Sequence, residues 1–64
     1  MKFKVGDIII NVHTDEVAVV KKVEREWALP VYEIEQTNDD GKVETIRFNV
    51  KYEIHWNLVV GEEE

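Results

Sequence analysis

The chain has 64 residues, no cysteine and a formal net charge of −6. This length predicts one domain that buries only about 60% of its unfolded surface, and the lack of cysteine excludes a disulfide scaffold and thiolate metal sites. The acidic balance disfavours a general nucleic-acid binder, because negative charge repels phosphate backbones.

The first twelve residues contain an apolar run, residues 8–12, after Gly6 and Asp7, which predict a turn or bulge. Asp7 precedes any long apolar run, so we expect no signal peptide, no membrane span and a cytoplasmic location. The run predicts a strand with Ile8, Ile10 and Val12 on one face. Ile9 falls on the other face, which indicates partial burial on both sides or contact with a partner.

Residues 13–16 are polar and predict the first loop. Residues 17–27 then predict a second strand. Four side chains share one face of this strand: Val17, Val19, Val23 and Trp27. Lys21 interrupts that face and Val20 falls on the other, so we expect a bulge near these two residues.

A third strand is predicted at residues 31–37, with Tyr32 and Ile34 on one face. Pro30 marks the connection before it or its first residue, because proline cannot donate to a strand ladder. Residues 38–41 end in Asp40-Gly41, a strong hairpin signal, since glycine adopts positive φ at no steric cost. Residues 24–29 could form one helical turn, but we interpret them as a strand end and a loop.

The longest pattern in the chain covers residues 46–56. Apolar side chains occupy every even position: Ile46, Phe48, Val50, Tyr52, Ile54 and Trp56. Every odd position is polar, and this strict alternation predicts a half-buried strand. Because eleven residues of strand would extend roughly 36 Å, we expect a bend or break near residues 49–51. Residues 57–60 predict a short closing strand.

These elements predict an all-β fold. Five short strands with tight turns bury one core best as a strongly bent, antiparallel SH3-like barrel. We assign residues 1–60 to this single domain and expect residues 61–64 to be a disordered acidic tail.

The order of these segments resembles a family of small barrels. Residues 3–9, with the sequence Lys4-Val5-Gly6-Asp7 inside them, resemble the first strand of Tudor-like and KOW-like domains and of small uncharacterised bacterial and phage barrels. The Val-rich residues 17–23, the tyrosine of the third strand, the Asp-Gly hairpin and residues 58–60 match the later strands. The resemblance implies an SH3-like fold and a binding role in a bacterial or phage accessory protein. Residues 13–16 depart from it, because they lack the glycine usual in that loop.

Catalytic chemistry is poorly represented in this sequence. It contains no serine or cysteine, so the hydroxyl and thiol nucleophiles reduce to Thr14, Thr37 and Thr45, and three isolated glycines form no phosphate loop. We therefore expect neither an enzyme nor a cofactor. His13, Asp15, Glu16 and His55 offer metal-ligand chemistry, but no zinc motif has this spacing, so we expect no metal site.

The chain contains six large aromatic residues, and similar rings in Tudor-like barrels cage methylated cations. Here we assign four of them to the core: Tyr32, Phe48, Tyr52 and Trp56. Trp27 is the exception, because it precedes Leu29-Pro30 at a strand end, where an exposed ring would anchor a protein partner. The acidic neighbours of Trp27 would suit a basic partner: Glu24, Glu26, Glu33 and Glu35.

The sequence thus predicts a non-catalytic protein–protein binding module, a monomer or weak homodimer, with Trp27, Leu29, Glu24 and Glu26 at the interface. A nucleic-acid-associated barrel is an alternative, and it needs five basic side chains on one face: Lys21, Lys22, Arg25, Arg47 and Lys51. An acidic mimic of nucleic acid that blocks a host enzyme is another. Its charged face would come from six carboxylates: Glu24, Glu26, Glu33, Glu35, Glu44 and Glu53.

Overall fold

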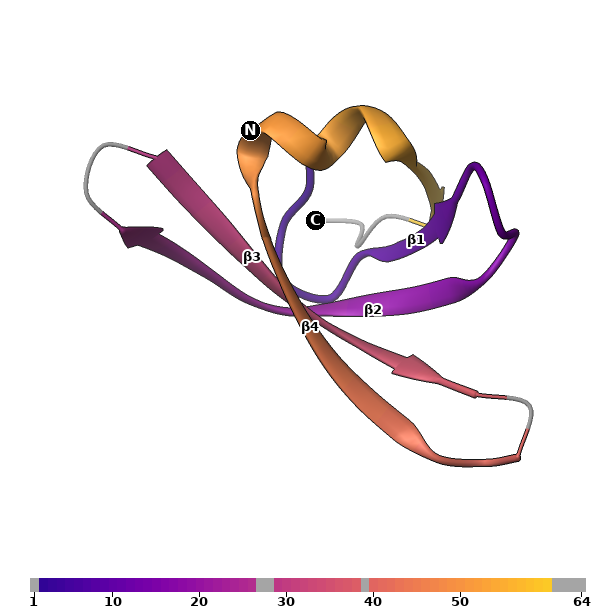
Figure 1. The fold of residues 1–64 in the computed structure, drawn as a ribbon. Helices are drawn as coiled ribbons and strands as arrows, with labels where there is room; N and C mark the ends of the chain where they lie inside the picture. Colours follow the sequence, from indigo (N-terminus) through magenta and orange to yellow (C-terminus); the bar gives the residue numbers. More distant parts are fainter. Residues whose placement is uncertain (1, 27–28, 39, 61–64) are drawn as a thin grey trace.

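A computed structural model describes residues 2–26, 29–38 and 40–60, and it shows a single antiparallel sheet with one short 3₁₀ helix (Figure 1). The elements follow one another along the chain as β1 (Ile8–Asn11), β2 (Val17–Glu26), β3 (Leu29–Thr37), β4 (Val43–Asn49), η1 (Val50–His55) and β5 (Trp56–Val60). The predicted all-β class is therefore confirmed. Trp27 and the acidic tail of residues 61–64 lie outside the described residues.

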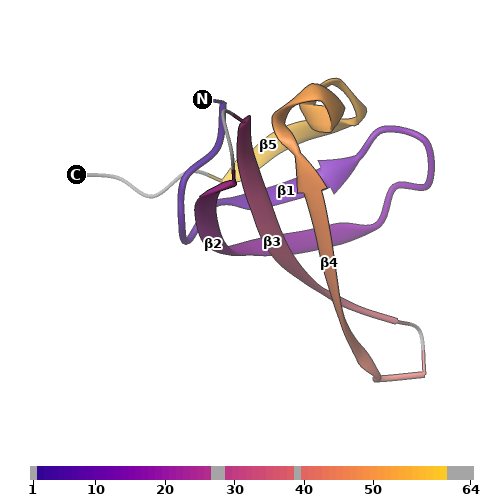
Figure 2. The same cartoon turned by 60° about the vertical axis from the view of Figure 1, so that its left-hand side comes forward.

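The strands are ordered β4-β3-β2-β1-β5, so the described sheet is open, with β4 and β5 as its edges. The sheet nevertheless curls until its two edges approach each other. The ring of Phe48 in β4 stacks on that of Trp56 in β5, with centroids 5.6 Å apart and planes 3° from parallel. In Figures 1 and 2, η1 carries the chain from β4 across to β5. The edges are thus joined by an aromatic stack and a short helix.

The core lies on the inner side of the curl. Its buried apolar residues come from the N-terminal segment and from four strands: Phe3, Ile9, Ala18, Val20, Tyr32, Ile34 and Trp56. Ile46 and Phe48 pack against this cluster from β4. The inward faces predicted for Tyr32, Ile34 and Trp56 are confirmed. Tyr52 was assigned to the core, and this is wrong, because 53% of it is exposed.

The burial on both sides predicted for the first strand is confirmed, since Ile9 is fully buried and every other residue of β1 is partly buried. In β2 the buried residues before the bulge are Ala18 and Val20, so the apolar face predicted at Val17 and Val19 is not the core face there. The predicted bulge is confirmed, since the β2–β3 register shifts between Val20 and Lys22. A bulge adds one residue to one strand, so it changes which positions face the core and brings Val23 against it.

The segment around Gly6 forms the predicted turn. Gly6 has a φ of 95°, a conformation that side chains with a Cβ rarely adopt. The buried Asp7 carboxylate accepts a hydrogen bond from the Lys4 amide at 3.0 Å, and the Asp7 carbonyl accepts one from the Val20 amide at 2.9 Å. These bonds attach the N-terminal segment to β2 and place Phe3 in the core.

The first loop and the β3–β4 hairpin each contain one residue with positive φ, but the residue type differs. In the β3–β4 hairpin, Gly41 has a φ of 84°, and the Asn38 amide donates to the Lys42 carbonyl at 2.7 Å, which confirms the predicted turn. The first loop has no glycine, and Asp15 takes the left-handed conformation there with a φ of 61°. Aspartate tolerates this region better than most residues.

The segment of residues 46–56 is broken where the sequence predicts, but its second half is not a strand. Asn49 ends β4, and its side chain accepts a hydrogen bond from the Lys51 amide at 2.9 Å and so caps η1. A 3₁₀ helix has three residues per turn, so Val50, Glu53 and Trp56 share one face. Ile54 lies on another face and is 76% exposed.

Glu53 fixes η1 to the core. The hydroxyl of Tyr32, a residue with no exposed surface, donates a short hydrogen bond to the Glu53 carboxylate and accepts one from the Phe3 amide at 3.2 Å. The Lys2 amide donates to the same carboxylate oxygen at 2.8 Å. Burial, together with the bond to Glu53, raises the pKa of Tyr32 to about 12.

This shift predicts a loss of stability in alkali. The unfolded tyrosine titrates near 10 and the folded one near 12, so the neutral hydroxyl stabilises the fold fully below pH 10 and progressively less up to pH 12. We expect Tyr32→Phe to cost about 1 kcal/mol at pH 7 and to remove part of this alkaline loss. Urea unfolding between pH 7 and pH 12 measures both effects.

Tyr52→Phe is the matched control, because this tyrosine is exposed. It should keep the wild-type dependence of the unfolding free energy on pH. Equal alkaline slopes in wild type and Tyr32→Phe would contradict the role given to the Tyr32 hydroxyl.

A second prediction concerns the hairpin turn. A Cβ added at Gly41 would meet no atom within 4 Å, so only the backbone conformation opposes substitution. We expect Gly41→Ala to lower the free energy of unfolding by about 1 kcal/mol. Denaturant unfolding of the variant tests this value, and an unchanged midpoint would contradict the assigned turn.

Candidate functional site

The main candidate site is an open hollow of about 390 Å³ where the first loop, β4, η1 and the start of β5 meet. We call it the aromatic pocket. Its lining residues are Asn11, His13, Thr14, Ile46, Phe48, Tyr52, His55 and Trp56. No aspartate, glutamate, lysine or arginine is among them, so recognition here would depend on rings, apolar contact and the two histidines.

The floor of the pocket continues the core. Tyr32 packs on Phe48 with ring centroids 5.2 Å apart, and Phe48 stacks on Trp56. Only 5% of Trp56 is exposed. A floor built from packed rings is rigid, so the shape of the pocket is largely fixed before any ligand arrives.

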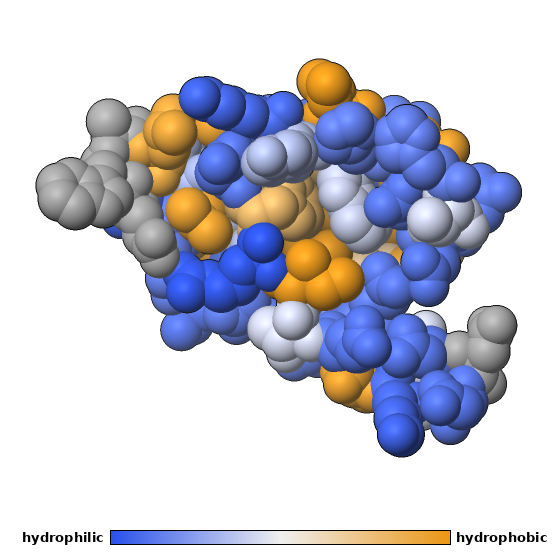
Figure 3. Space-filling view, in the orientation of Figure 1, coloured by the Kyte–Doolittle hydropathy of each residue, from blue (hydrophilic) through white to orange (hydrophobic). Residues whose placement is uncertain are grey.

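One wall of the pocket is η1. Its Tyr52 ring lies against the His55 ring at 6.0 Å between centroids and 28° between planes. Beside this wall, Ile54 is highly exposed. Figure 3 shows apolar surface near the centre of the face seen in Figure 1, bordered by hydrophilic side chains.

The first loop meets η1 through two histidines in contact. His13 Nε2 lies 2.8 Å from His55 Nδ1, although the two residues are 42 positions apart in the chain. At this distance one nitrogen donates a proton and the other accepts it. The backbones are also joined, because the Val12 amide donates to the His55 carbonyl at 2.9 Å.

A second hollow of about 720 Å³ adjoins the first loop. It contains the carboxylates of Asp15, Glu16 and Glu35, and it shares Thr14 with the aromatic pocket. Glu16 also accepts a hydrogen bond from the Gln36 amide group at 2.8 Å. Within the part of the chain that the structure describes, no three His, Cys, Asp or Glu side chains form a metal-binding group.

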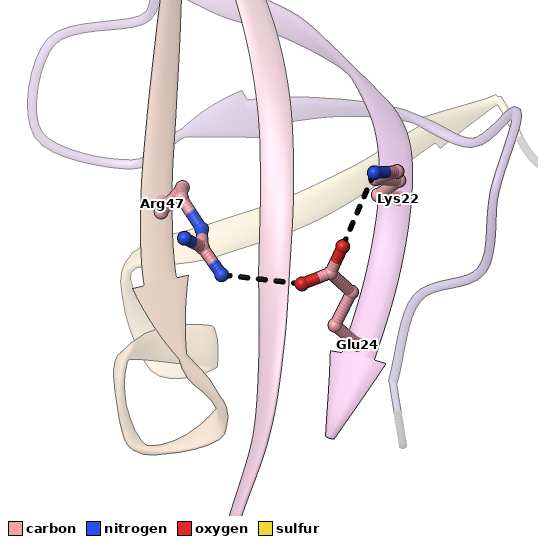
Figure 4. A network of polar contacts seen from close by, with 3 residues as sticks. All are labelled: Lys22, Glu24 and Arg47. Atoms are coloured by element: carbon pink, nitrogen blue, oxygen red, sulfur yellow. Dashed lines mark hydrogen bonds and ion pairs between the residues drawn. The ribbon is translucent and has the colours of Figure 1, made fainter. Parts of the chain in front are cut away.

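The predicted basic residues are mostly engaged with carboxylates on the strands. The Glu24 carboxylate lies between Lys22, at 3.2 Å, and Arg47, at 3.3 Å, and so links β2 to β4 (Figure 4). Lys21 pairs with Glu35 at 3.9 Å. Arg25 and Lys51 are exposed. Three of the five basic side chains therefore already have carboxylate partners, which reduces the positive charge that they could offer to a phosphate backbone.

Three of the predicted partner-binding residues lie at the same end of the β2–β3 pair. Glu26 pairs with Leu29 in the ladder, and Glu24 pairs with Val31 beside them. Leu29 is 38% exposed, and the Glu24 carboxylate is held by its two cations. Trp27 lies outside the described residues.

Four of the six carboxylates of the predicted acidic face have structural partners. Glu24 and Glu35 form ion pairs, Glu44 accepts from the Asn38 side chain at 3.0 Å, and the Glu53 carboxylate accepts from the Tyr32 hydroxyl. The separate partners of these four residues give little support to a mimic of nucleic acid.

The sequence did not reveal the aromatic pocket. The alternation of residues 46–56 assigned Tyr52 to the core, and no spacing rule joins two histidines so far apart in the chain. The signal that was present is local. Asparagine is a favoured residue at the start of a helix, and Asn49 caps η1. Its position could therefore have indicated the short helix that exposes Tyr52.

No family model, curated protein or solved structure matches this chain. Among the described residues, no helix has the length and apolar character needed to cross a membrane.

The ion pairs predict a small energetic role for Glu24. Its partners are about half exposed, and exposed pairs contribute less than about 1 kcal/mol each. We expect a double-mutant cycle of Glu24→Ala and Arg47→Ala to give a coupling energy below about 1 kcal/mol, measured by urea unfolding. A coupling above about 2 kcal/mol would show that this network holds the sheet together.

Proposed function

We propose that this chain is a small non-catalytic binding module of the SH3-like type, and that its aromatic pocket receives an apolar or aromatic side chain of a protein partner. The observation that carries the proposal is the exposed ring of Tyr52 beside the packed floor of Phe48 and Trp56. Aromatic side chains at the rim of an apolar hollow are the usual anchors of protein interfaces.

The fold type is supported by the strand arrangement. The sheet has five short antiparallel strands, and β1 pairs with both β2 and β5. The curl of the sheet brings the ring of Phe48 in β4 onto that of Trp56 in β5. A curl of this kind places the first loop and η1 around one hollow. Loops on a rigid scaffold commonly carry binding function.

The chemistry of the partner is suggested by the two neighbouring hollows. No acidic residue, lysine or arginine lines the aromatic pocket. The adjoining hollow is lined by three acidic residues, Asp15, Glu16 and Glu35. Thr14 lines both. A segment that crosses Thr14 would therefore place an apolar side chain on one side and a basic side chain on the other, and the net charge of −6 favours such a partner.

The test is affinity capture of partners from a bacterial lysate, with and without nuclease, using wild type, Tyr52→Ala and Trp27→Ala. For a captured protein, we expect Tyr52→Ala to weaken binding at least about tenfold, or about 1.4 kcal/mol, in isothermal titration. The fold should persist, because Tyr52 is exposed, and circular dichroism checks this.

Val43→Ala is the matched control, because Val43 is an exposed apolar residue of β4 that does not line the pocket. It should bind as the wild type does. Loss of binding in Trp27→Ala alone would move the interface to the strand end near Leu29. Capture that disappears with nuclease would favour nucleic acid, and Arg25 and Lys51 would be substituted next.

A further inference from the structure

We propose that His13 and His55 form a binding site for one divalent transition-metal ion of the zinc, nickel or copper class. The inference stands on the position of His13 Nε2 opposite His55 Nδ1 at 2.8 Å. It does not rest on the proposed function, since it needs no protein partner.

The separation of the two nitrogens is close to what shared coordination requires. Imidazole nitrogens bind zinc at about 2.0–2.1 Å, so two of them at 90° to 109° around one ion lie roughly 2.9–3.4 Å apart. The observed separation of 2.8 Å is shorter than the lower end of this range by only about 0.1 Å. Turning the two imidazole rings about their side-chain bonds would open the separation and direct both lone pairs to one point.

Hydrogen bonds of the backbone hold the segments that carry His13 and His55 in place. The Asn11 side-chain oxygen accepts hydrogen bonds from the His13 amide at 2.8 Å and from the Thr14 amide at 3.3 Å, which fixes the first loop. The Val12 amide bonds to the His55 carbonyl, and Tyr52 supports the His55 ring. Both ligands are therefore ordered before an ion arrives, which reduces the entropy lost on binding.

The donor chemistry selects the class of ion. Imidazole suits zinc, nickel and copper, whereas magnesium and calcium prefer oxygen ligands. Among the described residues no third ligand of the His, Cys, Asp or Glu type joins the pair, so water would fill the remaining coordination positions. When the ion binds, the donor ring moves its bridging proton to its other nitrogen by exchange with water, and the hydrogen bond between the rings is replaced by two metal–nitrogen bonds.

The sequence indicates His13 and His55 as potential metal ligands but does not pair them, because one lies on the first loop and the other at the end of η1. Asp15 and Glu16, which the sequence places beside His13, line the adjoining hollow instead. The fold thus separates the carboxylates from the histidines and joins the histidines to each other.

Zinc chloride titration of the ¹⁵N-labelled protein at pH 7.5, followed by long-range NMR of the imidazole nitrogens, tests the site directly. We expect saturation at one equivalent, with the shifts of metal-bound nitrogens at His13 Nε2 and His55 Nδ1 and with the proton of each ring on its other nitrogen. Zinc should also raise the melting temperature, because an ion that binds only the folded state stabilises it. His13→Asn and His55→Asn should each weaken binding at least about tenfold, since one ligand then acts alone.

The double variant His13→Asn/His55→Asn is the matched control, because it keeps all 14 carboxylates of the chain and reports their non-specific binding. Circular dichroism confirms that each variant folds. Equal zinc affinity in wild type and either single variant would overturn the site, as would metal coordination through His13 Nδ1 or His55 Nε2. Failure here leaves the effect of Tyr52→Ala on partner binding unchanged, so the two proposals fail separately.

Discussion

The buried hydroxyl of Tyr32 connects the parts of this domain that the strand ladder leaves unconnected. It accepts from the Phe3 amide and donates to the Glu53 carboxylate, so it links the N-terminal segment to β3 and to η1. Its ring also contacts the rings of Phe3 and Phe48. Because η1 carries Tyr52 and His55, the shape of the aromatic pocket depends on the hydrogen bond that joins Glu53 of the same helix to Tyr32.

The middle of the chain could be predicted because its signals are local. Tyr32 and Ile34 alternate in a strand with one buried face, and Gly41 supplies the positive φ of a tight turn. The bulge near Val20 and Lys21 was visible as a break in the alternation itself. In each case a few adjacent residues determine the conformation, and the rest of the fold need not be known.

The second half of residues 46–56 could not be assigned by the same reasoning. Val50 and Trp56 are six positions apart, a multiple of both two and three, so a strand and a 3₁₀ helix place them on the same face. Glu53 distinguishes the two, since it faces inward only with period three. A carboxylate is a poor candidate for the core unless its partner is known, and that partner, Tyr32, lies in another strand. The His13–His55 pair was hidden for the same reason.

The pairing of β1 with β5 has a consequence for how fast the chain folds. Ile9 lies between Ala18 of β2 and Leu58 of β5, so the first strand gains its second neighbour only from the last. The β2–β3 and β3–β4 pairings join strands that follow each other in the chain, whereas the β1–β5 pairing closes a loop over most of the described residues. Because closing a long loop costs chain entropy before the contact gives any stability, this pairing makes folding slower than the two hairpins alone would require.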